Sequence, residues 1–232
     1  MILILMLLVA CLSGPVLGQA VKARATAKLP ATGGPAPVAA VPPKGDPLAG
    51  ARKSDEERCQ ECHGADGHGF GQSASSEGRH PKLAGQPAEY IVKQIADFRS
   101  GARKHDVMTL MARTVEPADI LDIAAYFASR TPMKGEGAAG NPLGRRLYES
   151  GDAARGVDAC IACHGPAGQG IAGLGADAPR IGGQEWRYLE KQLLDWRSGE
   201  RRNSRDGVMN RVTRALTDEE LRALTDYLAA QP

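Results

Sequence analysis

The pentapeptide C-x-x-C-H occurs twice in this chain, and a methionine follows each copy at the same distance. Its residues are Cys59, Cys62 and His63 in the first copy and Cys160, Cys163 and His164 in the second. Met108 and Met209 each lie 45 residues beyond the histidine of their own copy. The pentapeptide is typical of covalent attachment of haem c, in which both thiols form thioethers and the histidine ligates the iron. The sequence therefore predicts two haem sites.

A methionine is the expected ligand on the other face of each iron. Met108 and Met209 share one spacing, whereas Met111 aligns with Val212 in the second copy and is expected to pack against apolar neighbours. With histidine and methionine on its two faces, iron keeps no open position for a substrate. Its natural task is then to carry one electron, at a potential that the thioether raises.

Each proximal histidine should donate its second ring N–H to an oxygen, which fixes the orientation of the ring. The segments PKLAGQ and PRIGGQ begin at Pro81 and Pro179, whose nitrogens carry no competing N–H. We therefore expect the carbonyl oxygens of these two prolines to be the acceptors.

Two other kinds of site also use closely spaced cysteines. A redox-active dithiol does not need the histidine, which is nevertheless present in both copies. A zinc site needs a complete ligand set, and the two copies stand 101 residues apart. Both alternatives therefore explain the pattern less fully than haem does.

From about residue 48 the chain is an internal duplication. The two motifs, their methionines and the pair Tyr126 and Tyr227 are displaced by 101 residues. Between motif and methionine the displacement is 98 residues, and it relates Pro81, Gly85, Gln86, Tyr90, Gln94 and Arg99 to Pro179, Gly183, Gln184, Tyr188, Gln192 and Arg197. The expected organisation is one domain at 48–132, a Gly-rich linker at 133–142 and a second domain at 143–232.

Within each repeat the hydrophobic spacing is helical. Apolar residues at three- and four-residue steps predict amphipathic helices around 90–98 and 188–196. A last helix is expected to begin near Pro117 in the first repeat and near Thr217 in the second, where Thr217 and Glu220 form a capping box. The sequence shows no alternating strand pattern. We therefore expect an all-α fold. Because only 4% of residues are aromatic, side chains alone provide little material for a core, and each domain is expected to wrap around one haem.

The N-terminal segment predicts export. Residues 1–20 are almost wholly apolar and read as a signal peptide, although Cys11 also ends a lipobox-like segment that would make a lipoprotein or membrane anchor. Residues 21–47 are rich in Ala and Pro and are expected to form a disordered tether. Either interpretation places the domains in the periplasm, free or attached to the membrane through the N-terminus.

Three histidines and one arginine-rich stretch have open interpretations. His68, His80 and His105 have no counterparts in the second repeat and are expected in solvated loops, with competition for iron in denatured or high-pH states as the alternative. The arginines of 197–214 could neutralise haem propionates or bind an acidic partner, and they could equally form a solvated loop.

The repeats resemble the dihaem cytochrome c4 family. The segments that carry the resemblance are CQECHGADGHG, PKLAGQPAEYIVKQIADFRSG and DILDIAAYFAS in the first repeat and CIACHGPAGQG, PRIGGQEWRYLEKQLLDWRSG and DEELRALTDYLAAQ in the second. The resemblance covers about residues 48–232. It implies two class I cytochrome c folds packed face to face, with the haem propionate edges near the interface, in a periplasmic carrier that delivers electrons to a terminal oxidase.

The expected function is one-electron transfer without bond-making chemistry. The partners implied are an upstream quinol-oxidising complex or dehydrogenase and a terminal oxidase. The formal charge of +2 argues against nucleic acid as the main partner. The main alternative is the cytochrome subunit of a dehydrogenase, such as a flavin-dependent sulfide dehydrogenase, with the flavin on another polypeptide. A dihaem peroxidase fits less well, because it needs an iron with an accessible position.

Overall fold

A computed structural model describes residues 44–69, 80–135 and 140–232 of the chain, all of which belong to one compact unit. The secondary structure of these residues is helical, and their only β-type pairing is an isolated bridge between Asp152 and Val157. The all-α prediction is therefore confirmed. The predicted signal or anchor at 1–20, with Cys11, and nearly all of the predicted tether at 21–47 lie outside the described residues.

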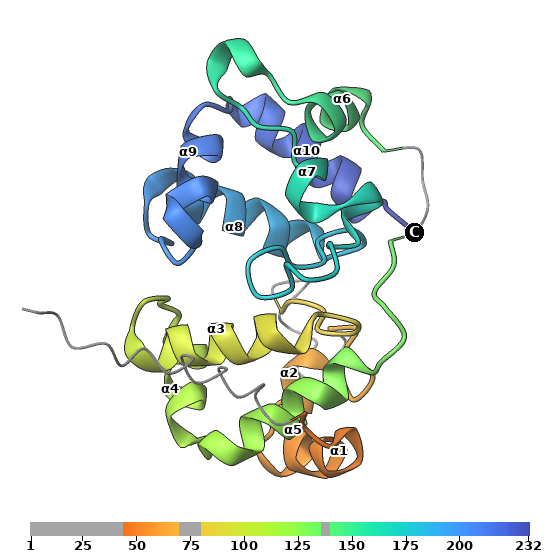
Figure 1. Ribbon diagram of the computed structural model, residues 1–232, viewed down its shortest axis with the longest axis vertical. Coiled ribbons are helices and arrows are strands. Elements are labelled where there is room, and N and C mark those ends of the chain that lie inside the picture. The colour runs from red at the N-terminus through yellow and green to blue at the C-terminus, as the bar shows by residue number, and fades with distance from the viewer. Residues whose placement is uncertain (1–43, 70–79, 136–139) are drawn as a thin grey trace, which may run out of the picture. The chain divides into compact units, whose positions relative to one another are not determined.

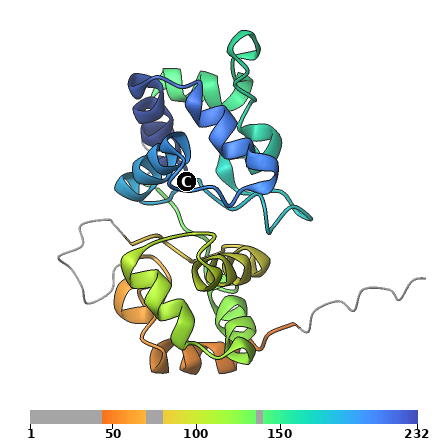
Figure 2. The same ribbon diagram turned by 90° about the vertical axis from the view of Figure 1, so that its left-hand side faces the viewer.

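In the first repeat, here called the first half (residues 44–135), the described residues form five α-helices (Figure 1). Their bounds are α1 Pro47–Glu56, α2 Gln60–His63, α3 Ala88–Ser100, α4 Asp106–Thr114 and α5 Pro117–Ala128. The second half (residues 140–232) repeats this order of α-helices, with 3-10 turns between them, as α6 Pro142–Ser150, η2 Ala153–Arg155, α7 Ile161–His164, η3 Pro166–Gly168, α8 Trp186–Ser198, η4 Arg205–Gly207, α9 Val208–Arg214 and α10 Asp218–Ala229. Figures 1 and 2 show the five α-helices of each half gathered as one group.

The helix starts follow from local sequence. Asp46 caps α1 by accepting a hydrogen bond from the N–H of Leu48, and Asn141 caps α6 through the N–H of Leu143, each with a proline as the first helical residue. The capping box predicted at Thr217 is present at the start of α10. The last helix of the first half begins at Pro117, as expected.

The first and last helices of each half cross at a glycine. A Cβ on Gly50 of α1 would lie 1.9 Å from the carbonyl oxygen of Asp122 in α5, and one on Gly144 of α6 would lie 1.9 Å from that of Ala223 in α10. Only glycine lets the two backbones approach so closely. These two glycines thus let the first and last helices of each half pack closely against each other.

Each half has its own apolar core. In the first, Ile91 of α3 packs with the buried face of α5 that includes Ile123 and Phe127. In the second, Leu189 of α8 packs with α10 and with Tyr148 of α6. The long helices α3 and α8 thus present one apolar face to their own core, as their spacing predicts, and hold the chemistry-bearing segments in place.

Candidate functional site

Both C-x-x-C-H motifs form a single helical turn, α2 or α7, that carries its histidine inward. His63 and His164 are buried although they are polar. Each turn ends at a glycine with positive φ, Gly64 at 79° and Gly165 at 72°. A side chain is strained in that conformation, which explains why glycine follows the motif in both copies.

The ring orientation of both histidines is fixed by a backbone carbonyl. The distance from His63 Nδ1 to the carbonyl oxygen of Pro81 is 2.9 Å, and that from His164 Nδ1 to Pro179 is 3.0 Å. The acceptors predicted from the sequence are therefore confirmed. If each Nδ1 carries the proton donated to the carbonyl, Nε2 keeps its lone pair for a metal ion.

Burial keeps these imidazoles neutral. It lowers the pKa of His63 to about 4, an effect that the hydrogen bond to Pro81 opposes, and it also lowers the pKa of His164. A neutral imidazole is the form that ligates a metal. The electrostatics of both positions therefore suit a ligand better than a proton-transfer group.

The cysteines do not have the electrostatics of a redox dithiol. Burial raises the pKa of Cys59 and that of Cys160 to about 11, whereas reactive dithiols lower the pKa of one thiol. Among the described residues no group of three or more His, Cys, Asp or Glu side chains is arranged to hold a metal ion. None of the four motif cysteines forms a disulfide bond, so their sulfurs are available for thioethers.

A cavity of about 1630 Å³ is lined by residues of both halves. The predicted site residues that line it are Cys59, Cys62, His63, Met108, His164 and Met209; Cys160 and Cys163 do not. Its apolar wall comes largely from α3 and α8, including Phe98 and Trp196. A single small-molecule site usually measures about 300–1,000 Å³, so this volume suits more than one large apolar group.

The methionines separate as the duplication predicts. Met108, near the start of α4, and Met209, near the start of α9, line the cavity, whereas Met111 does not. His105 caps α4, its Nδ1 accepting a hydrogen bond from the N–H of Met108 at 3.3 Å. One of the three unmatched histidines therefore helps to start the helix that carries a candidate ligand.

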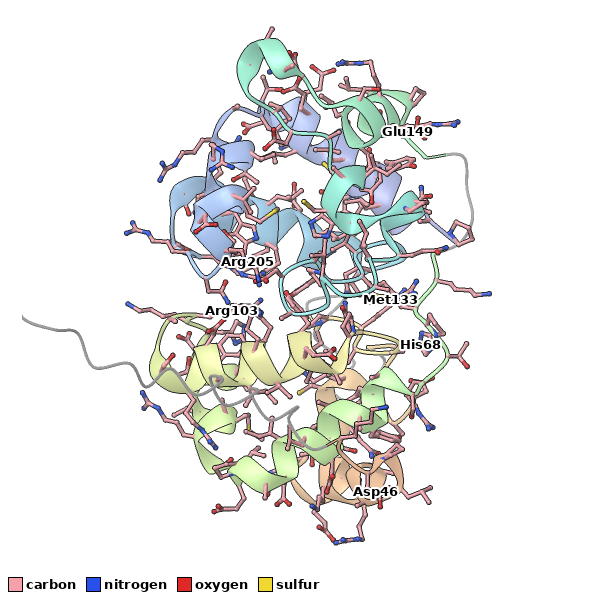
Figure 3. The ribbon with its side chains drawn as sticks, viewed as in Figure 1. Asp46, His68, Arg103, Met133, Glu149 and Arg205 are labelled. Carbon is pink, nitrogen blue, oxygen red and sulfur yellow. The ribbon has the colours of Figure 1, made fainter. Side chains whose placement is uncertain are left out.

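The expectation of solvated loop histidines is wrong for His80. Its side chain is only partly exposed, lines the cavity and lies with its ring centroid 6.2 Å from that of His63. His68 is also only partly exposed, and its backbone N–H donates to Asp66 (Figure 3). His80 lies beside the motif turn and is therefore partly covered. Its separation from His63 in the sequence gives no sign of this position.

The arginine-rich stretch 197–214 is not one solvated loop. Arg197 pairs with Asp218 at 2.6 Å, and Arg205 pairs with Asp177 (Figure 3). Arg201 is buried, and its guanidinium stacks 4.3 Å from the ring centroid of Trp196. Most of the stretch is therefore committed to contacts within the protein.

Arg103 is the counterpart of Arg201 in the first repeat, a relation that the sequence analysis missed. It lies 98 residues earlier and is equally buried. Arg103 donates to Gln94 (2.8 Å), to Tyr188 (3.0 Å) and to Gln192 (2.7 Å). Arg201 donates to the equivalent three groups, Gln192 (2.7 Å), Tyr90 (3.0 Å) and Gln94 (3.1 Å). The displacement of 98 already found for the tyrosines and glutamines was the available signal.

The surroundings of these arginines indicate whether the cavity suits a prosthetic group that carries acidic groups. Arg103 and Arg201 both line it, and the side-chain groups they bind are neutral. Arg180 lines it too, and within the described part of the chain its buried Nε has no hydrogen-bond partner. Buried cations are normally paired with anions. The residues therefore fit haem, which brings an apolar macrocycle and two carboxylates.

The comparisons with known proteins agree with this geometry. The family model for cytochrome c matches residues 48–131 and again 143–231. Cytochrome c4 of Thiocapsa roseopersicina is 40% identical over 193 residues, covering 82% of this chain and 95% of that protein. A protein named "Thiosulfate dehydrogenase electron acceptor", from Stutzerimonas stutzeri (strain A1501), is 37% identical over 175 residues, covering 74% of this chain and 77% of its own length.

The fold also matches a solved structure. The crystal structure of reduced recombinant cytochrome c4 from Pseudomonas stutzeri superposes with a TM-score of 0.72 at 34% identity, over 81% of this chain and all of that one. No helix in the described residues is long and apolar enough to cross a membrane. The chain therefore belongs to the cytochrome c family and, within it, to the dihaem cytochromes c4, electron-transfer proteins whose two tandem domains each bind a covalent haem c.

Proposed function

We propose that this protein is a periplasmic one-electron carrier in which each half holds its iron between a histidine and a methionine. The axial ligands are His63 and Met108 in the first half and His164 and Met209 in the second. The thioethers form at Cys59 and Cys62 in the first half and at Cys160 and Cys163 in the second. A haem iron ligated in this way accepts and releases one electron without an open coordination position.

The observation that carries this proposal is the matched pair of ligand sets in one cavity. In each half a buried neutral histidine lies at hydrogen-bonding distance from a proline carbonyl, and a methionine from the second α-helix after the motif helix lines the same cavity. The carbonyls keep the rings oriented, the apolar walls exclude water, and the buried arginines supply positive charge for the propionates. All of these features limit rearrangement when the charge on iron changes.

The ligands can be tested with histidine substitutions. Met108→His and Met209→His should each remove about half of the weak sulfur-to-iron absorption band at the red end of the oxidised spectrum. Each should also lower the potential of one haem, since an imidazole favours ferric iron more than a thioether does. Met111→His is the matched control, because Met111 does not line the cavity. Full retention of the band in Met108→His would contradict the proposal.

The redox partners form the second part of the proposal. We infer that the carrier accepts electrons from a quinol-oxidising complex or a dehydrogenase and delivers them to a terminal oxidase, the acceptor that the resemblance to the cytochrome c4 family implies. The similarity to a thiosulfate dehydrogenase electron acceptor favours a dehydrogenase as donor and is the specific support for the alternative of an acceptor subunit. Nothing in either similarity requires a flavoprotein donor.

Donor choice can be measured with the oxidised holoprotein. Rapid reduction by a thiosulfate dehydrogenase with thiosulfate, and slow reduction by a quinol-oxidising complex, would favour the acceptor-subunit alternative. The reverse order would favour the respiratory carrier. Mass spectrometry of protein isolated from the periplasm would define the mature N-terminus and show whether Cys11 is retained with lipid. An unprocessed N-terminus on cytoplasmic protein would contradict the localisation.

A further inference from the structure

Two glutamines join the halves, because each forms hydrogen bonds with the backbone of the proline loop in the opposite half. Gln184 accepts a hydrogen bond from the N–H of Lys82 at 2.7 Å and donates its amide N–H to the carbonyl of Lys82 at 2.9 Å. In the mirror contact, Gln86 accepts from the N–H of Arg180 at 3.1 Å and donates to its carbonyl at 2.6 Å. Both glutamine side chains are buried, with exposed fractions of 3% for Gln184 and 4% for Gln86.

One peptide group contacts both Gln184 and the candidate ligand His63. The carbonyl of Pro81 and the N–H of Lys82 belong to the same peptide bond. His63 Nδ1 lies 2.9 Å from that carbonyl oxygen, and the N–H on the other side of the bond donates to Gln184. A continuous hydrogen-bonded path therefore runs from the histidine of the first half to a side chain of the second.

The second half contains the mirror path. His164 Nδ1 lies 3.0 Å from the carbonyl oxygen of Pro179, and the N–H of the same peptide bond, that of Arg180, donates to Gln86 of the first half. The duplication alone would produce two equal loops, but it does not require that each loop be completed by the other half. The exchange is a property of the folded pair.

Hydrogen bonds in such a path strengthen one another. When the N–H of a peptide group donates, its carbonyl becomes more negative and accepts more strongly. A stronger acceptor draws the imidazole proton and raises the basicity of the ligating nitrogen. A more basic ligand stabilises ferric iron relative to ferrous iron and lowers the reduction potential.

We propose that Gln184 and Gln86 are positioning residues that set, across the domain boundary, the electron-donating strength of the histidine in the opposite half. The proposal rests on the axial roles of His63 and His164 given above. Gln184 acts on the haem of the first half, and Gln86 acts on the haem of the second. Each haem potential thereby depends on the docking of the two halves.

The interface does not depend on these glutamines alone. Lys82 Nζ donates to the carbonyl oxygen of Gly183 at 2.8 Å, and Asn203 Nδ2 donates to Asp97 at 2.6 Å. The buried arginine pair adds six further hydrogen bonds, four of them between the halves. A single glutamine substitution should therefore leave the halves docked while it removes one histidine path.

The test measures one haem at a time in the full-length holoprotein. In a Met209→His background, the sulfur-to-iron band reports only the first half, so its redox titration gives that potential directly. Adding Gln184→Leu should raise it, so that the ratio of ferrous to ferric iron at a fixed ambient potential increases about threefold or more. A tenfold increase would correspond to about 59 mV for one electron. In a Met108→His background, Gln86→Leu should raise the potential of the second half.

The crossed design separates this effect from a general loosening. Gln184→Leu in the Met108→His background should leave the second-half potential within experimental error. Asn203→Leu is the matched control, because it removes the side-chain hydrogen bonds to Gln94 and Asp97 across the same interface without touching either path. Gln184→Asn, whose shorter amide falls short of Lys82, should act in the same direction if the leucine variant folds poorly.

Several outcomes would overturn the inference. An unchanged first-half potential in both Gln184 variants would do so, as would equal shifts of both haems or a shift matched by Asn203→Leu. Failure of the underlying ligand proposal is distinguishable, because the Met209→His background would then show no sulfur-to-iron band or no covalent haem before any glutamine is changed.

Discussion

In the first half, Tyr126 of α5 donates its hydroxyl to the carbonyl of Ala65, in the loop just after the motif turn. In the second half, Tyr148 of α6 donates to the carbonyl of Gly165 at 2.6 Å, again just after the turn. The sequence counterpart of Tyr126 is Tyr227, which instead packs against Tyr148 with ring centroids 5.4 Å apart. The two halves therefore fasten the same loop with tyrosines from different helices.

The comparison shows that the duplication preserves a contact more faithfully than a residue. The helix crossing is the opposite case, since Gly50 and Gly144 occupy equivalent places with the same 1.9 Å approach. A tyrosine hydroxyl can reach a loop carbonyl from more than one direction. A backbone crossing has only one solution, because no other residue lacks Cβ.

The largest expected effect tests the feature that the halves share. Gly50→Val and Gly144→Val should each destabilise the protein by about 3 kcal/mol, because the added side chain must push one backbone away from another. Ala49→Val, one residue earlier in α1, is the control and should cost much less. Thermal unfolding of the holoproteins followed by circular dichroism would measure both. A large difference between the two glycine variants would mean that the crossings are not equivalent.

The next effect tests the feature in which the halves differ. Tyr126→Phe and Tyr148→Phe should each cost about 1 kcal/mol, since a loop carbonyl loses its donor while the ring still packs. Tyr227→Phe should cost less, because its ring supplies packing to Tyr148 and phenylalanine keeps that packing. Denaturant unfolding would rank the three variants. If Tyr227→Phe were the most damaging, the sequence displacement would identify the working tyrosine better than the structure does.

Much of the fold could be predicted from local rules. The amphipathic spacing around 90–98 and 188–196 falls on α3 and α8, and Thr217 caps α10 as its capping box indicates. The acceptors at Pro81 and Pro179 were also predictable, because a proline carbonyl in a repeated loop is a well-defined candidate. These features depend on residues that are close in sequence or fixed by the repeat.

The missing parts depend on contacts between the halves or on the direction of a side chain. Arg103 and Arg201 share the displacement of 98 residues, but their pairing with the opposite half follows only once the halves are docked. Similarly, Gln86 and Gln184 were recognised as repeated without any sign that each completes the other's loop. Tyr148 carried no signal at all, since its role depends on the direction in which its ring leaves α6.

The smallest expected effect concerns the ion pair that each half forms with its last helix, because acid weakens such a pair. In the second half, Arg155 of η2 pairs with Glu220 of α10 at 2.6 Å, and in the first half Lys53 of α1 pairs with Asp122 of α5 at 2.5 Å. The hydrogen bond from Arg155 holds the pKa of Glu220 below its ordinary value, and that from Lys53 does the same for Asp122. Both carboxylates thus favour the folded state in their charged form.

The sign of the pH dependence follows from those lowered values. A carboxylate whose pKa falls on folding contributes stability above its unfolded pKa, about 4.3 for glutamate, and loses that contribution as the pH falls through its folded pKa. Glu220→Gln should therefore lower the melting temperature slightly at pH 7 and have progressively less effect below about pH 4. The amide oxygen can still accept from the N–H of Thr217, so the helix cap survives. Glu219→Gln, an exposed neighbour in the same turn, is the control. A constant difference between Glu220→Gln and the parent from pH 7 to pH 3 would mean that the charge of Glu220 does not brace the second half, and that the two halves resist acid by different means.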